Sequence, residues 1–183
     1  MKKIIAMLLV LVMAVSLLAG CNSQPTADPT TPVENKPQLT GTPEELLNKL
    51  VEAVPVEFMG GAMAIDLTDT SEDGIYWFTS HTGLENADSV SEAAFYEPMM
   101  GSIPYSMVIV RVKEGADAKA VGEAMKSGID PRKWICVEAD DLQVCGYGDV
   151  VMLIMVGSDT GMTSQSYVDA FAALCGGKTD FTI

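Results

Sequence analysis

The first twenty residues differ from all that follow and limit where the rest of the chain folds. Lys2 and Lys3 precede an apolar run from Ile4 to Ala19 that only Ser16 interrupts. A membrane-spanning helix needs about 20 apolar residues, and this run is shorter. Its basic start and its length are those of an export signal that is later removed. We therefore predict that residues 1–20 are a signal peptide and that the remainder folds outside the cytoplasm.

The apolar run ends in Leu18-Ala19-Gly20-Cys21. This tetrapeptide resembles the lipobox of bacterial lipoproteins, with Leu three residues before the cysteine and small residues between them. The resemblance implies diacylglyceryl transfer to the Cys21 thiol, cleavage after Gly20, and a mature N-terminus at Cys21 that carries fatty acyl chains such as palmitate. Two acyl chains hold a protein stably on a bilayer. The alternative is an ordinary secretory signal with a cysteine nearby.

Residues 22–42 contain four prolines among Thr, Asn, Asp and Gln, and they have no apolar face. Such a segment is typical of a solvated, partly polyproline-like tether. Residues 43–183 then have the length of one domain. The predicted organisation is a signal peptide at 1–20, a lipidated cysteine with a Pro/Thr-rich tether at 21–42, and a single α+β domain at 43–183.

The charge balance limits the possible partners. The formal net charge of −14 becomes −16 once Lys2 and Lys3 are removed with the signal peptide. A protein this acidic is repelled by nucleic acid and by anionic lipid. We therefore expect no nucleic-acid partner, and membrane attachment through the lipid anchor only.

Periodicity and turn residues predict the elements of the domain. Thr42-Pro43-Glu44-Glu45 is a capping box that starts the first helix, which Pro55 ends. The predicted helices are 43–54, 89–96, 117–127 and 163–174, and the predicted strands are 62–67, 75–79, 106–112, 134–139, 142–145 and 150–156. This order favours an α+β fold in two layers, with a mixed or antiparallel sheet of about five strands and helices mainly on one face.

Three cysteines follow Cys21, so their pairing is a separate question. If Asp140-Asp141 is a two-residue turn, Cys136 faces Cys145 as a non-hydrogen-bonded pair, with Cα atoms about 4.5 Å apart. That distance permits a disulfide. The alternative is two buried, reduced cysteines, because Asp-Asp is a poor hairpin turn.

No set of catalytic residues stands out, so we predict no enzymatic activity and no cofactor. His81 is the one histidine, and a hydrolase built on it is the least favoured hypothesis. Asp69, Ser71 and Asp73 have the opening spacing of a calcium loop. Ser80 occupies the position where that motif requires a bidentate acid, so these residues are weak metal candidates, and a solvated hairpin turn is the preferred interpretation.

One basic–aromatic cluster, Arg132-Lys133-Trp134, lies on an otherwise acidic chain. It is a possible interaction patch, and the alternative is a core tryptophan preceded by two exposed cations.

Three patterns in the chain belong together: the lipobox with its tether, Glu97-Pro98-Met99-Met100-Gly101-Ser102-Ile103, and the segment from Asp130 to Val137 with Gly148-Asp149-Val150-Val151. Together they resemble a family of small Gram-positive lipoproteins with a domain of unknown function. The resemblance spans roughly residues 43–157. It implies a lipid-anchored α+β domain and supplies no activity or site residue.

These observations favour a lipid-anchored, extracytoplasmic lipoprotein that works as a non-enzymatic binding or interaction module. The expected partner is an envelope protein or a cell-wall component. The alternative is an envelope protein that binds a small ligand or a cation such as Ca²⁺, with Asp66, Asp69 and Asp73 as ligands.

Overall fold

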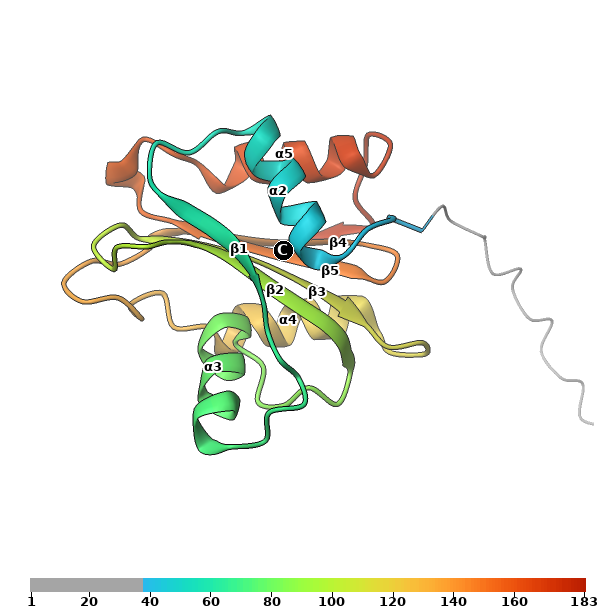
Figure 1. Ribbon diagram of the computed structural model, residues 1–183. Helices are drawn as coiled ribbons and strands as arrows, with labels where there is room; N and C mark the ends of the chain where they lie inside the picture. Colours follow the sequence, from blue (N-terminus) through green and yellow to red (C-terminus); the bar gives the residue numbers. More distant parts are fainter. Residues whose placement is uncertain (1–37) are drawn as a thin grey trace, which may run out of the picture. The chain divides into compact units, whose positions relative to one another are not determined.

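The computed structural model describes residues 38–183, which belong to one compact unit (Figure 1). The predicted signal peptide, Cys21 and most of the tether lie outside the described residues. Among residues 38–183, no helix is long and apolar enough to cross a membrane. The helices are α2 (Pro43–Ala53), α3 (Glu72–Thr82), α4 (Ala118–Gly128) and α5 (Ser164–Leu174), with the short 3-10 turn η1 (Ser158–Thr160).

A six-stranded antiparallel sheet forms the middle layer, in the order β1-β2-β3-β5-β4-β6. The strands are β1 (Gly60–Ala64), β2 (Val90–Pro98), β3 (Tyr105–Val112), β4 (Asp141–Tyr147), β5 (Val150–Val156) and β6 (Phe181–Thr182). The α+β class and the sheet packed by helices are as predicted from the sequence.

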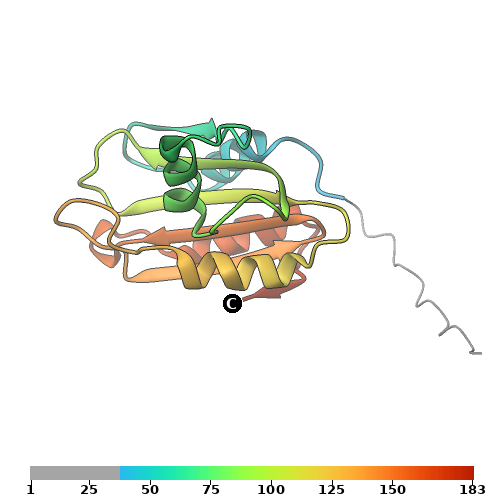
Figure 2. The same cartoon turned by 90° about the horizontal axis from the view of Figure 1, so that it is seen from below.

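Helices cover both faces of the sheet, whereas the sequence predicted them mainly on one. Helices α2 and α5 lie on one face and α3 and α4 on the other (Figures 1 and 2). Strands β3 and β5 are buried along their whole length because both faces are covered. Their side chains alternate between the two cores, with Met107 and Ile109 on the α2/α5 face and Val108 and Val110 on the α3/α4 face.

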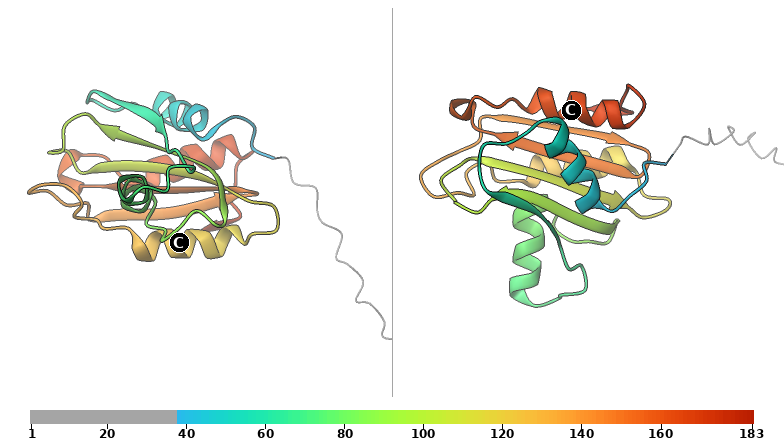
Figure 3. Two further views of the ribbon diagram at one scale, coloured as in Figure 1. Left: turned by 60° about the horizontal axis from the view of Figure 1, so that its bottom comes forward. Right: turned by 45° about the horizontal axis from the view of Figure 1, so that its top comes forward.

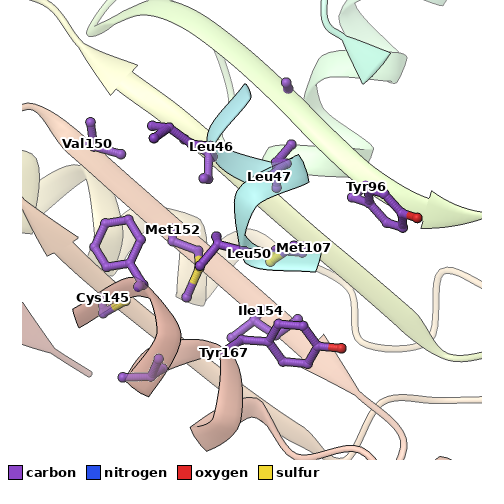
Figure 4. Packing of buried hydrophobic residues seen from close by; sticks show 14 of the residues in the cluster. Leu46, Leu47, Leu50, Tyr96, Met107, Cys145, Val150, Met152, Ile154 and Tyr167 are labelled. Atoms are coloured by element: carbon purple, nitrogen blue, oxygen red, sulfur yellow. The ribbon is translucent and has the colours of Figure 1, made fainter. Parts of the chain in front are cut away.

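The core on the α2/α5 face contains the leucines of the helix that the capping box starts. Thr42 accepts a hydrogen bond from the Glu45 amide, and the Glu45 side chain accepts one from the Thr42 amide. The helix that starts there directs Leu46, Leu47 and Leu50, at helical spacing, onto the sheet. Figure 4 shows them against Met107 and other β-strand residues, with Tyr167 of α5 closing the far side.

Three predicted elements are wrong. The predicted strand 75–79 and the acidic hairpin turn before it are helix α3 and its capped start. The predicted helix 89–96 is strand β2, in which a register shift between Val90 and Glu92 breaks the strand alternation and imitates helical spacing. The predicted strand 134–139 is an irregular loop between α4 and β4, which the Ala139 amide closes by bonding to the Pro131 carbonyl at 2.8 Å.

The predicted disulfide depended on a 134–139/142–145 hairpin that does not exist. Cys136 lies exposed in the loop with a left-handed φ of 67°, and Cys145 is buried in β4, where it faces Met152. All three cysteines of residues 38–183 are free. Burial raises the pKa of the Cys145 and Cys175 thiols to about 12, so both stay protonated at neutral pH.

Candidate functional site around helix α3

Helix α3 begins in the acidic segment that the sequence singled out. Ser71 is the N-cap, and its hydroxyl accepts a hydrogen bond from the Gly74 amide at 3.1 Å. Asp69 in turn accepts bonds from the Ser71 amide and hydroxyl, at 2.9 and 2.6 Å, and these bonds lower the pKa of its carboxyl. Asp73 is exposed in the first turn. The three weak metal candidates therefore form a helix start, and among residues 38–183 no cluster of three or more acidic, His or Cys side chains suits a metal ion.

The inward face of α3 carries Phe78, His81 and Thr82 at helical spacing, and all three are buried. The outward face is unusual for a protein surface in contact with water, because it exposes large apolar side chains. Ile75 is 50% exposed and Tyr76 is 70% exposed. The helix thus presents an apolar outer surface while its inner surface packs on the sheet.

Under α3 lies a buried polar cluster, which we define as Glu97, Ser106, Lys133 and His81. The Ser106 hydroxyl donates to Glu97 Oε1 at 2.6 Å, and the Lys133 ammonium donates to the same oxygen. Lys133 also donates to the Ser106 hydroxyl at 3.2 Å and to the Ser80 carbonyl at 3.4 Å. His81 Nε2 lies 3.7 Å from the second carboxylate oxygen of Glu97. Side chains of β2, β3, α3 and the α4–β4 loop therefore meet on one carboxylate.

Electrostatics keeps the Glu97 carboxyl ionised. Burial opposes ionisation of Glu97, but the contact with His81 and the charge and hydrogen bond of Lys133 outweigh it and lower the pKa of the carboxyl to about 2. Burial lowers the pKa of Lys133, and Glu97 partly offsets that effect. A buried ion pair is tolerated only when its hydrogen bonds are completed, and Ser106 and Ser80 complete them here.

The hydrogen bonds of His81 determine that one of its ring nitrogens is protonated. Nδ1 lies 2.7 Å from the Trp77 carbonyl, which can only accept, so Nδ1 carries hydrogen. The ring is packed between Trp77 and Phe95, with centroids 4.5 and 3.9 Å away. His81 is thus a buried residue that joins α3 to β2.

Ser106 and Lys133 are close enough to resemble a nucleophile and its base. A catalytic serine needs an accessible hydroxyl and a base free to take its proton. Ser106 has no exposed surface, its proton is directed at Glu97, and the lysine is ion-paired to that same carboxylate. The arrangement suits the attachment of the α4–β4 loop to the sheet rather than acyl transfer.

A cleft of about 580 Å³ opens between α3 and the start of the α4–β4 loop. Tyr76, Thr79 and Ser80 line it from the helix, and Arg132 and Lys133 line it from the loop. We call this the α3 cleft. Figure 3 shows α3 projecting from its face of the sheet.

The predicted patch Arg132-Lys133-Trp134 is divided by this geometry. Arg132 is exposed at the α3 cleft, and Lys133 is directed inward to Glu97. Trp134 is half-buried against the core of the α3/α4 face, with the Lys133 ammonium 5.6 Å from its ring centroid. Ile135, two residues beyond Lys133, is 84% exposed.

A second polar site, which the sequence did not reveal, fixes the start of the described chain. Arg111 is 8% exposed and pairs with Asp149 at 2.7 Å. Its second terminal nitrogen donates to the carbonyls of Leu39 and Gly41, and Gln38 donates to Asp149 at 3.1 Å. The planar guanidinium satisfies several acceptors at once, so residues 38–41, the last part of the predicted tether, are held against the domain.

Comparisons of this chain with models of known protein families, with curated proteins and with solved structures find no match.

Proposed function

We propose that this chain is a lipid-anchored lipoprotein of the cell envelope, whose domain binds another envelope protein through the α3 cleft without catalysing a reaction. The lipobox-like Leu18-Ala19-Gly20-Cys21 and the proline-rich tether support the anchor. They lie outside the described residues, so the structure does not bear on them.

The observation that carries the binding proposal is the surface of the α3 cleft. Tyr76 exposes 70% of its surface beside the exposed Arg132. Trp77, outside the cleft, is 44% exposed on the same helix. Tyr, Trp and Arg are the residues that most often dominate binding energy at protein interfaces. Exposing such apolar surface to water is unfavourable in free energy, and a partner that covers these side chains removes that penalty.

The buried polar cluster, which lies under α3, supports the same proposal. Lys133 and His81 connect the two walls of the α3 cleft to one carboxylate. A surface whose supporting residues are fixed loses less conformational entropy on binding.

Photocrosslinking in intact cells tests the proposal. A photoreactive residue at position 76 of the full-length chain should give a discrete adduct with an envelope protein, and Arg132→Ala should reduce its yield several-fold. The matched control is the same residue at position 52, an exposed site on α2 on the opposite face.

Two results would count against the proposal. Equal adducts from positions 76 and 52 would indicate unspecific proximity. An adduct that stays with the cell wall after extraction in hot detergent would indicate a wall component in place of a protein.

A further inference from the structure

Strand β1 forms one edge of the sheet, and within residues 38–183 no strand pairs with its outer side (Figure 2). The Met99 amide donates to the Met59 carbonyl and the Ile65 amide to the Ala93 carbonyl, each at 2.9 Å. Odd-numbered residues therefore bond to β2. Because alternate residues direct their backbone groups to opposite sides of a strand, those of 60, 62 and 64 point away from the sheet.

This edge lacks the usual protections. Natural sheets guard their edges with charges, prolines, bulges or covering segments. Residues 58–65 contain no charge and no proline, and the β1–β2 ladder runs without a register shift. Gly61, Met63 and Ala64 are exposed. The edge can therefore accept another strand.

We propose that two copies of this chain associate through antiparallel pairing of their β1 strands, with Ala62 of each copy on a twofold axis. In this register Ala62 faces Ala62 of the second copy, and Gly60 faces its Ala64. These are hydrogen-bonded pairs that use the outward backbone groups. A twofold interface requires one surface to be complementary to itself. This register meets that requirement, because each strand presents the same residues to the other.

The side chains fit the same register. Gly61 faces Met63 of the second copy in a non-hydrogen-bonded pair, where opposing side chains come closest. A Cβ built on Gly61 would meet nothing within 4 Å, and Met63 is 54% exposed. Each methionine thus has open space over the glycine of the other copy.

Charge limits where two copies can meet. Two acidic molecules with a formal net charge of −14 each repel one another over most of their surfaces. The uncharged stretch 58–65 lets them meet without like charges directly opposed. This interface is separate from the α3 cleft and does not depend on the proposed function.

Cysteine crosslinking in the full-length chain in intact cells tests the register. Both test variants carry Cys136→Ser, because Cys136 is exposed. Ala62→Cys places two thiols on Cα atoms about 5.5 Å apart, within disulfide range. Ala64→Cys is the matched control, since its two copies lie roughly 14 Å apart along the strands.

Mild oxidation should give a dimer with Ala62→Cys and none with Ala64→Cys. A reducing agent should convert that dimer back to monomer. Cys136→Ser alone, which keeps Cys21, should give none. Adding Met63→Glu to the Ala62→Cys variant should lower the dimer yield at least fivefold, because it places charge at the interface, and Met100→Glu, outside β1, should leave it unchanged. No dimer with Ala62→Cys, equal dimer with Ala64→Cys, or no effect of Met63→Glu would overturn the proposal.

Discussion

At the scale of single residues, Glu97 has the most consequences, because three side chains from other elements converge on its carboxylate. Ser106 and Lys133 bond to one oxygen, and His81 approaches the other. The carboxylate joins β2 to β3, to α3 and to the α4–β4 loop. Its charge is therefore part of the tertiary structure.

Replacing Glu97 by Gln leaves Lys133 buried without a counter-charge. Removing one partner of a buried pair costs about 3–5 kcal/mol, and because Lys133 keeps Ser106 and Ser80 we expect the lower end, about 3 kcal/mol in the free energy of unfolding. Urea unfolding of the full-length chain measures it. The control Glu123→Gln, at a side chain that is 60% exposed, should cost less than about 0.5 kcal/mol. Equal losses in both variants would contradict the assignment.

The same carboxyl predicts an acid-sensitive range. Its pKa is 4.5 as an ordinary glutamate and about 2 in the folded protein. The folded state therefore binds fewer protons, so the stabilisation by Glu97 is complete above about pH 4.5 and is lost as pH falls towards 2. Between these values the wild type should lose more stability than Glu97→Gln, as measured by chemical unfolding at each pH. Parallel pH profiles would show that Glu97 is not the responsible group.

The sequence identified only part of this site. His81, as the one histidine, and Lys133, in the basic–aromatic cluster, stand out in the sequence, but Glu97 and Ser106 do not. Ser106 carried a signal, because a hydroxyl next to an apolar run that is buried on both faces needs a partner. Glu97 carried none, since its partners lie 9, 16 and 36 residues away along the chain, and only the fold brings them together.

At the scale of elements, two glycines decide how α3 and α4 meet. Gly83 ends α3 in the left-handed conformation, with φ of 75°, as a helix C-cap often requires. A Cβ on Gly128, at the end of α4, would overlap the Gly83 carbonyl oxygen. The two helix ends therefore approach at backbone distance.

Gly128→Ala should destabilise the protein by about 1–3 kcal/mol, because the added methyl must displace the backbone of Gly83. Gly101→Ala is the matched control, since a Cβ there would meet nothing within 4 Å. The difference between their melting temperatures, measured by circular dichroism, checks this. A Gly128→Ala protein as stable as Gly101→Ala would contradict the close approach.

Elements were predictable from the sequence where local signals and tertiary packing agreed. Helix α2 has a complete capping box, and strands β3 and β5 are continuous apolar runs, so all three were predicted. The sequence of helix α3 favours a strand, because Ile75-Tyr76-Trp77-Phe78 is rich in strand-forming residues. The Ser71 cap and the Gly83 end determine the helix, and only Phe78 of that run is buried.

At the scale of the whole molecule, covering both faces of the sheet explains why the two central strands read as continuous apolar runs. The apolar runs indicate that both faces are covered but not which segments cover them, so the sequence alone did not assign α3 and α4 to the second face. The α3 cleft, the Arg111 site and the β1 edge are products of this layering.

The proposal that this domain works on a lipid anchor rests on Cys21, and mass spectrometry of the N-terminal peptide from purified membranes tests it most directly. We predict a chain that begins at Cys21 and carries a diacylglyceryl group on its thiol, and a Cys21→Ser chain that leaves the membrane fraction. A mature chain cut elsewhere, or one that keeps a free Cys21 thiol, would contradict the account.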